Sequence, residues 1–243
     1  MLRPICFAIA GAFIALSLGS VHAGRLEHSP CVDDAMIVFD ASGSMSGNEK
    51  LGIATTISRI DEVRSALASV LPSATRFRRV GLITYGPGPY NQCNVELNLE
   101  PTPNAAGLIM RVVNGLMPAG KTPLAAAVEQ AANALNFRQE PGVVVVVTDG
   151  EETCGGSPCE LGKRLHAESA QLVIHVIAYR TDSFTWTGEQ SIVASRCLAE
   201  QNNGLYVTAA SQEELVAAFR STLDCPMISE GALTSPRHVS KGF

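Results

Sequence analysis

The sequence predicts an α/β fold built on a doubly wound, mostly parallel six-stranded sheet, with one antiparallel edge strand and helices on both faces. Apolar runs rich in β-branched residues alternate along the chain with segments whose apolar residues recur at helical spacing. The run 142–150 contains five consecutive valines, which indicates a strand buried on both faces. About 220 residues remain once a leader is removed, enough for one domain with its own core.

Six segments have the character of strands. The third alternates apolar and polar residues, which is typical of a strand with one face in water. It follows the second after a short loop, so we expect an antiparallel pair at the edge of the sheet. The predicted strands are 35–40, 79–86, 94–101, 142–150, 171–180 and 204–209.

Helical patterns fill the intervals between these strands. We expect Asn104 to cap the second helix and Pro123 to occupy the first turn of the third. Ser157, Pro158 and Glu160 have the pattern of a capping box at the start of the fourth. The predicted helices are 57–72, 104–116, 122–137, 157–170, 189–201 and 211–223.

The first 23 residues have the pattern of a secretory signal peptide. Arg3 precedes an apolar stretch at 5–18, and a small-residue cleavage site ends at Ala23. The alternative is a membrane anchor, but the apolar stretch is shorter than the roughly 20 residues of a spanning helix. We expect a secreted, periplasmic protein without a membrane span. Its expected parts are a signal peptide (1–23), a lead (24–30), one domain (31–225) and a flexible tail (226–243).

The charge of the chain narrows the class of partner. The formal net charge is −5 at pH 7, and loss of Arg3 with the leader makes it −6. The basic residues form no stripe. This balance argues against nucleic acid or an anionic membrane as the partner.

Six of the seven cysteines remain after cleavage. An even number of cysteines in an exported chain predicts disulfides. Cys31 precedes the first strand and Cys225 follows the last helix, so a bond between them would join the ends of the domain. The candidates are Cys31, Cys93, Cys154, Cys159, Cys197 and Cys225.

Two pairings of the other four cysteines stay open. The local pair Cys154–Cys159 would leave Cys93 to reach Cys197, and these two are expected near opposite ends of the sheet. A disulfide requires Cα atoms about 4.4–6.8 Å apart. We therefore favour Cys93–Cys154 with Cys159–Cys197, which joins neighbouring elements.

Polar residues follow two of the buried strands and precede one helix. Asp40, Ser42 and Ser44 come after the first strand, Asp149 after the valine strand, and Thr122 ahead of the third helix. The carboxyl ends of parallel strands meet at one edge, where ligands bind at the reversal of strand order. All five residues offer oxygen, the ligand that Mg²⁺ and other hard divalent cations prefer.

Each of these groups also has a plain structural interpretation. The first can be a strand-ending turn, Thr122 a helix cap, and Asp149 with Gly150 an ordinary turn. We expect Gly43 to let the first loop bend sharply. Their joint occurrence, in order, at places that the fold brings together favours a cation site.

Three segments in this order resemble the von Willebrand factor A (VWA) domain: DASGS (40–44), GKTPL (120–124) and VVVVVTDGEE (143–152). The metal-ion-dependent adhesion site (MIDAS) of that family is Asp-x-Ser-x-Ser, then a Thr, then an Asp. The matching positions are Asp40, Ser42, Ser44, Thr122 and Asp149. The resemblance covers 31–225 and implies a Rossmann-like fold and an exported bacterial single-domain member.

The resemblance also implies a mode of binding. The ion would be Mg²⁺, or Mn²⁺ or Ca²⁺, bound directly by the serines and the threonine and often through water by the aspartates. Thr122 would be the ligand that comes and goes with conformation. An acidic side chain of another protein would complete the shell. The sequence sets neither the identity of that protein nor an oligomeric state.

The sequence lacks the residues that three other kinds of site would require. A phosphate loop needs a longer glycine-rich segment with a lysine. A haloacid dehalogenase-type phosphotransferase needs an aspartate where Ser42 stands, and a serine hydrolase needs a histidine partner. His175 falls inside a buried strand, and His166 falls on a helix. We predict a protein-binding module for adhesion or assembly and not an enzyme. The alternatives are a metal-dependent hydrolase or phosphotransferase using the same pocket, and an assembly factor for an exported enzyme.

Two predicted loops carry aromatic residues at the same edge of the sheet. Tyr85, Tyr90, Phe184 and Trp186 are candidates for an aromatic rim around the cation. The alternative is ordinary packing within the loops.

Overall fold

The computed structural model describes residues 33–47, 49–50, 53–54, 57–180 and 188–224. Several sequence predictions lie outside these ranges, namely the signal peptide (1–23), the lead (24–30), Cys31, Phe184, Trp186, Cys225 and the tail (226–243). No helix within the described ranges is both long and apolar enough to cross a membrane.

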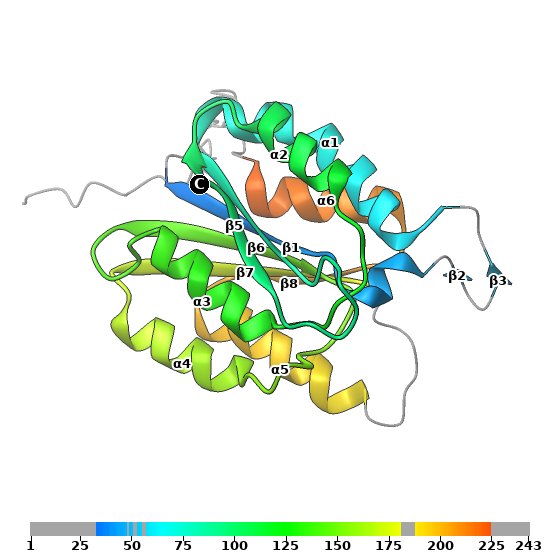
Figure 1. Ribbon diagram of the computed structural model, residues 1–243. Coiled ribbons are helices and arrows are strands. Elements are labelled where there is room, and N and C mark those ends of the chain that lie inside the picture. Colours follow the sequence, from blue (N-terminus) through cyan, green and yellow to red (C-terminus); the bar gives the residue numbers. More distant parts are fainter. Residues whose placement is uncertain (1–32, 48, 51–52, 55–56, 181–187, 225–243) are drawn as a thin grey trace, which may run out of the picture.

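Six strands form one twisted sheet in the order β5-β4-β1-β6-β7-β8 (Figure 1). All neighbouring pairs are parallel except β4 and β5, so the predicted fold class and the antiparallel edge strand are confirmed. The strands are β1 (Asp34–Asp40), β4 (Val80–Tyr85), β5 (Val95–Thr102), β6 (Pro141–Thr148), β7 (Gln171–Tyr179) and β8 (Tyr206–Ala209). A separate pair, β2 (Glu49–Lys50) with β3 (Ile53–Ala54), was not predicted.

Helices cover both faces of the sheet. In Figure 1, α1, α2 and α6 lie on one face and α3, α4 and α5 on the other. The helices are α1 (Arg59–Phe77), α2 (Ala106–Gly115), α3 (Leu124–Ala134), α4 (Pro158–Glu168), α5 (Gly188–Gln201) and α6 (Gln212–Leu223), with a short 3₁₀ helix η1 (Gly43–Ser46) after β1.

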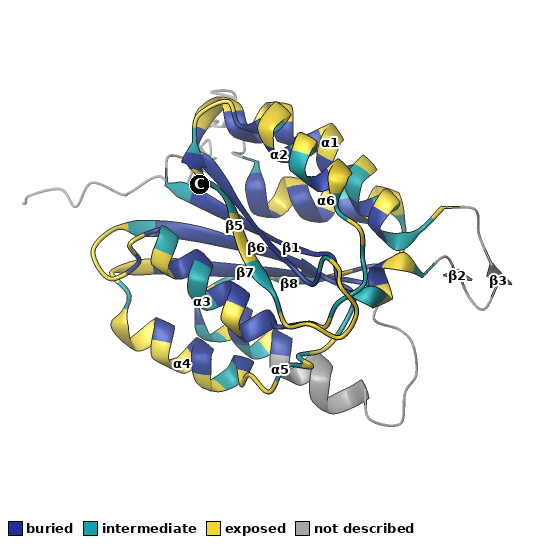
Figure 2. Ribbon diagram, viewed as in Figure 1, coloured by how far each residue is buried: buried dark blue, intermediate teal, exposed yellow. Residues whose placement is uncertain are grey.

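The central strands divide their side chains between two cores. Ile37 and Phe39 of β1 pack with α1, α2 and α6, whereas Met36 and Val38 pack with α3, α4 and α5. The valines of β6 alternate in the same way. Because successive side chains of a strand point to opposite faces, a wholly apolar strand is the expected sequence at this position. Figure 2 shows both strands buried beyond their first residue.

The first helix runs past its predicted end. Pro72 lies inside α1, which continues to Phe77. Proline removes one helical hydrogen bond, to the carbonyl of Ala68, but Ala68 is exposed and water can solvate that group. The final turns also bury Ala74 and Thr75, which offsets the lost bond.

Three predicted helix starts differ in detail. Asn104 does not cap α2, because it adopts a left-handed φ of 54°, which asparagine tolerates, and Ala105 is the N-cap. Pro123 is the N-cap of α3 rather than a residue of its first turn. Ser157 is the N-cap of α4 but makes no side-chain cap bond, so the predicted capping box does not form. Instead, the Glu160 carboxylate accepts a bond from a lysine one turn later.

Two disulfides are present among the described residues, Cys93–Cys154 and Cys159–Cys197. This is the pairing that the sequence favoured over the local pair. Their Cα–Cα distances are 5.9 and 5.0 Å. The first joins the loops that follow β4 and β6, and the second joins α4 to α5.

His175 is a neutral structural residue of β7. Its Nδ1 accepts a hydrogen bond of 2.9 Å from the backbone N–H of Leu205. Burial, with a smaller contribution from the charge of Arg78, lowers the pKa of this imidazole from 6.5 to about 4. His175 is hydrogen-bonded, as the interpretation of a satisfied structural histidine expects, but it is half-buried rather than part of the core.

We predict that His175 contributes to acid sensitivity. The folded protein binds a proton at His175 more weakly than the unfolded chain, so this contribution to stability is present above pH 6.5 and is lost as the pH falls toward 4. His175→Asn keeps an acceptor near the Nδ1 position but does not titrate. Urea unfolding at several pH values should show a free energy of unfolding that declines about 1–2 kcal/mol more in the wild type than in the variant over this range. Identical declines would contradict the assignment.

Candidate metal centre

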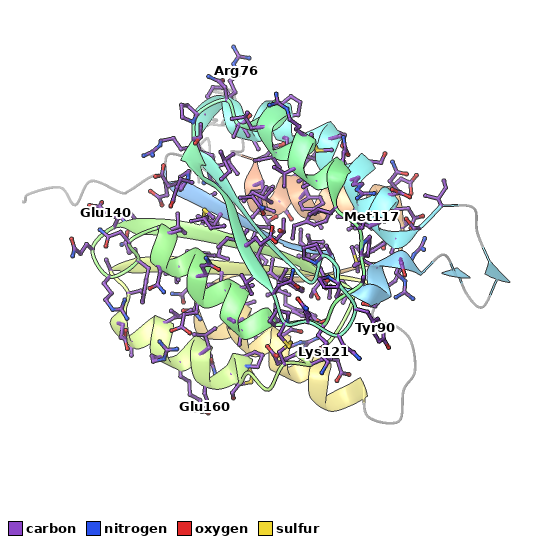
Figure 3. All side chains as sticks on the ribbon, in the orientation of Figure 1. Arg76, Tyr90, Met117, Lys121, Glu140 and Glu160 are labelled. Atoms are coloured by element: carbon purple, nitrogen blue, oxygen red, sulfur yellow. A yellow bond between two sulfur atoms is a disulfide. The ribbon has the colours of Figure 1, made fainter. Side chains whose placement is uncertain are left out.

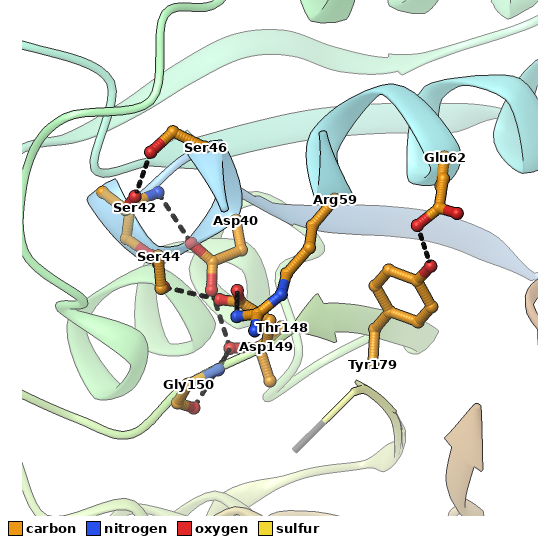
Figure 4. Close-up of polar contacts among 11 residues, drawn as sticks. Asp40, Ser42, Ser44, Ser46, Arg59, Glu62, Thr148, Asp149, Gly150 and Tyr179 are labelled. Atoms are coloured by element: carbon orange, nitrogen blue, oxygen red, sulfur yellow. Dashed lines mark hydrogen bonds and ion pairs between the residues drawn. The ribbon is translucent and has the colours of Figure 1, made fainter. Parts of the chain in front are cut away.

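The predicted polar residues meet where the strand order reverses. β1 and β6 are adjacent, and the chain leaves β1 toward β4 on one side and β6 toward β7 on the other. Asp40 is the last residue of β1, and Asp149 follows the last residue of β6. This point of a doubly wound sheet leaves a crevice outside the strand ends, where ligands bind. Figure 4 shows the two carboxylates side by side there.

The loop after β1 turns back on itself through η1. Ser42 N donates to Asp40 Oδ1 at 2.7 Å, and Ser46 Oγ donates to the carbonyl of Gly43 at 2.7 Å. Met45 is fully buried and fixes the turn to the core. This conformation leaves the hydroxyl oxygens of Ser42 and Ser44 3.0 Å apart.

The predicted role of Gly43 is wrong. The described glycines with positive φ are Gly86 and Gly155, so the bend at Gly43 does not use a conformation that favours glycine. A Cβ added to Gly43 would lie 3.4 Å from Ala119 O, an ordinary contact. The bend arises from the 3₁₀ turn, in which Met45 N donates to the carbonyl of Ser42.

Hydrogen bonds surround both buried carboxylates. Thr148 Oγ1 donates to Asp40 Oδ2 at 2.8 Å, and Ser44 Oγ donates to Asp149 Oδ1 at 2.6 Å. Burial, and then the charge of Asp149, raises the pKa of Asp40 to about 6. Burial likewise raises the pKa of Asp149. The site therefore holds two acidic groups whose charges are costly together.

Thr122 lies beside these residues, in the loop before α3. The hydroxyls of Thr122 and Ser44 are 3.9 and 3.6 Å from the point where a Cβ on Gly150 would stand. Thr122 is buried, and because Pro123 is the N-cap of α3, Thr122 is not the helix cap of the alternative interpretation. Its backbone N–H instead donates to Thr153 Oγ1 at 2.8 Å.

Sequence reasoning missed Arg59, the first residue of α1. Its Nη1 lies 2.8 Å from Asp149 Oδ2, with side-chain exposures of 17% for the arginine and 0% for the aspartate. Cations are favoured at the C-terminus of a helix rather than at its N-terminus. An arginine in the first turn of the helix that follows the DASGS loop was therefore the available signal for a nearby acidic partner.

A second polar cluster ties α1 to the end of β7. The hydroxyl of Tyr179 donates to Glu62 Oε2, and Arg180 Nη2 donates to Glu62 Oε1 at 2.8 Å. Burial and the Glu62 carboxylate raise the pKa of Tyr179. Since both oxygens of Glu62 are engaged, this carboxylate serves the fold at the edge of the site (Figure 4).

The oxygen spacing fits a small hard cation. Adjacent ligands in an octahedral Mg²⁺ shell, with metal–oxygen distances of about 2.0–2.1 Å, lie about 2.9 Å apart. Ser42 Oγ and Ser44 Oγ lie 3.0 Å apart, as two adjacent ligands would, and Ser44 Oγ is held by the hydrogen bond of 2.6 Å that it donates to Asp149 Oδ1. Among the described residues no group of three or more His, Cys, Asp and Glu could hold a metal, so a cation at this place would depend on hydroxyl oxygens as well as on the two carboxylates.

The predicted aromatic rim is wrong for Tyr85, which is fully buried. Tyr90 is 79% exposed and Met117 is 77% exposed. Figure 3 shows both side chains at the end of the sheet that carries the site, with Tyr90 close to Lys121. Tyr90 and Met117 therefore contribute exposed apolar surface at this edge, and Tyr85 does not.

Comparisons with known proteins agree with this fold. The family model described as the von Willebrand factor type A domain matches residues 35–152. The uncharacterized protein YwmC of Bacillus subtilis is 30% identical over 193 residues, covering 75% of this chain and 79% of the relative. YwmD of the same organism is 28% identical over 197 residues, covering 75% and 81%.

Solved structures share the fold at low identity. The vWF domain of the type V pili tip protein Mfa5 from Porphyromonas gingivalis has a TM-score of 0.57 at 14% identity, covering 78% of this chain and 93% of that one. The PilB minor pilin from Streptococcus sanguinis has a TM-score of 0.55 at 14% identity, covering 78% and 60%. At this identity the likeness establishes the fold alone.

We predict that Arg59 stabilises the protein when no cation is added. In Arg59→Ala the buried Asp149 loses its cationic partner, and loss of one member of a buried pair should lower the free energy of unfolding by about 2–4 kcal/mol. Urea unfolding in chelator measures the change.

Arg164→Ala is the matched control for Arg59→Ala. Arg164 pairs with Glu129 at 2.9 Å, but both side chains are 43% exposed. An exposed pair contributes less than about 1 kcal/mol, so this variant should unfold almost as the wild type does. Equal losses in the two variants would contradict a special role for Arg59.

Proposed function

Because the chain belongs to the von Willebrand factor type A domain family, we propose that it is an exported module that binds another protein through a divalent cation. The cation is Mg²⁺, with Mn²⁺ or Ca²⁺ as substitutes. The observation that carries the proposal is the convergence of two buried carboxylates, Asp40 and Asp149, with hydroxyl oxygens at the spacing of one coordination shell.

In the proposed site the hydroxyls and the carboxylates have different roles. Ser42, Ser44 and Thr122 offer neutral oxygens to the ion, while Asp40 and Asp149 hold its charge, mostly through water. When bound, the cation would act as a hard Lewis acid that a carboxylate oxygen of the partner protein coordinates. Thr148 fixes Asp40 through the 2.8 Å hydrogen bond, so the carboxylate is oriented before anything binds.

The charge of the site favours an acidic partner. The two carboxylates carry two negative charges and Arg59 carries one positive charge. A divalent cation reverses the sign and leaves one net positive charge in a buried setting. An anionic side chain would offset that charge more favourably than a neutral one.

A role in adhesion or assembly has support from the structures that share the fold. Mfa5 is a tip protein of type V pili, and PilB is a minor pilin. The two disulfides are typical of an oxidising compartment, in keeping with a secreted, periplasmic protein. We extend this setting to the present chain, with binding as the role rather than catalysis.

Calorimetry with MgCl₂ tests the cation site. The wild type should bind Mg²⁺, Asp40→Ala should abolish binding, and Ser44→Ala should weaken it by at least about tenfold. Ser46→Ala is the matched control, because Ser46 lies in the same turn but its hydroxyl donates to Gly43 O. Absence of binding by the wild type to Mg²⁺, Mn²⁺ and Ca²⁺, or equal binding by Asp40→Ala, would overturn the proposal.

Capture from the native cell envelope tests the partner. A protein retained by the immobilised wild type should be lost in chelator and in Asp40→Ala, and it should be retained by Ser46→Ala. Capture that ignores chelator and mutation would contradict cation-dependent binding. Turnover of a phosphate or ester substrate that disappears in Asp40→Ala would instead favour a metal-dependent hydrolase or phosphotransferase.

A further inference from the structure

The backbone around Thr122 is held by two loops that are distant in sequence. Lys121 N donates to the carbonyl of Gln92 at 2.8 Å, from the loop after β4. Thr122 N donates to Thr153 Oγ1 at 2.8 Å, and Thr153 N returns a bond to the carbonyl of Thr122 at 3.0 Å. These bonds fix two successive residues against the loops on both sides.

A disulfide joins these same two loops. Cys93 follows Gln92, and Cys154 follows Thr153, so the covalent bond connects the immediate neighbours of both residues that hold the Thr122 segment. Gln92, Cys93 and Thr153 are exposed, and core packing therefore does not fix them. The disulfide is what converts two surface loops into one rigid support.

The support is also tied to the helix that begins just after Thr122. Glu152 Oε2 accepts a bond of 2.8 Å from Ala125 N in the first turn of α3, and Glu152 Oε1 accepts one of 2.7 Å from Cys154 N. The loop after β6 is thus hydrogen-bonded to the first turn of α3, and the disulfide from Cys93 links the loop after β4 to it.

We propose that the Cys93–Cys154 disulfide and Thr153 form a clamp that positions the Thr122 hydroxyl for the cation. This inference rests on the proposed function. A threonine ligand of this family is expected to come and go with conformation, whereas the clamp holds Thr122 in place before cation or partner arrives. The chain thereby pays the ordering cost of this ligand during folding, and the cation site is preorganised.

The second disulfide provides a matched control. Cys159–Cys197 closes a stretch of 38 residues against 61 for Cys93–Cys154, and loop-closure entropy depends only weakly on that difference. It joins α4 to α5, and none of the hydrogen bonds that hold the Thr122 segment comes from either cysteine's neighbours. Its removal should therefore destabilise the fold to a similar extent without loosening Thr122.

Calorimetry with MgCl₂ compares the two pairs. Cys93→Ser with Cys154→Ser should weaken Mg²⁺ binding by about 10- to 100-fold, the effect typical of groups that orient a metal ligand. Cys159→Ser with Cys197→Ser should leave the affinity of the folded protein within about twofold. Thr153→Val should weaken binding as well, and Thr153→Ser, which keeps the hydroxyl acceptor, should restore it.

Hydrogen exchange in chelator tests the clamp without any cation. The amides of Lys121 and Thr122 should exchange at least about tenfold faster when Cys93 and Cys154 are replaced, because their acceptors lie next to the bond. The same amides should keep their protection when Cys159 and Cys197 are replaced. Protection is read by NMR on the intact, folded protein.

The outcomes separate the two proposals. Wild-type binding of Mg²⁺ with equal affinity in every variant would overturn the clamp and leave the proposed function standing. Unchanged exchange at Lys121 and Thr122 after loss of Cys93–Cys154 would overturn it too. A wild type that binds no cation would overturn both, and the exchange result would then assign the disulfide to loop structure alone.

Discussion

The parallel pairing of β1 with β6 brings two buried carboxylates together at the centre of the sheet, and the surrounding structure depends on this contact. Asp40 ends one strand and Asp149 follows the other, in a region where burial disfavours charge. The fold offsets that cost with a backbone N–H, two hydroxyls and the Arg59 guanidinium. An isolated buried carboxylate would cost several kcal/mol of stability, so the two carboxylates depend on each of these donors.

The loops around the carboxylates are bonded to one another and form a connected scaffold. Gly43 N donates to Gly120 O at 2.9 Å, which joins the serine loop to the segment before Thr122. The loop after β4 and the loop after β6 hold that segment from both sides, and the Cys93–Cys154 disulfide connects them. Preorganised oxygen ligands lose little freedom on binding a cation, which is the physical advantage of such a scaffold.

Sequence patterns were reliable where a long-range contact and a local preference agreed. The alternation of apolar runs and helical patterns predicted the order and type of the six strands of the main sheet and of the six α-helices, since burial imposes periodicity directly on the sequence, but it did not predict the short pair β2 and β3. Local rules failed at three places. At Pro72, burial of Ala74 and Thr75 outweighed the preferred helix end. Asn104 adopts a left-handed φ instead of capping α2, and Glu160 accepts a bond from a lysine instead of completing the Ser157 capping box. A less favourable helix cap or helix end costs about 1 kcal/mol of stability. The burial of one or two apolar side chains is enough to offset that cost.

The sequence by itself determined the sheet, the family resemblance and the five oxygen-bearing residues that converge on one edge, because each leaves a pattern within a short segment. It also favoured the correct pairing of four cysteines. Only the tertiary structure decided that Tyr85 is buried, that Gly43 is not a required glycine, and that Arg59 reaches Asp149 across 90 positions of the chain. An ion pair at that separation depends on how α1 docks on the sheet, and no local pattern encodes the position of one helix relative to a distant loop.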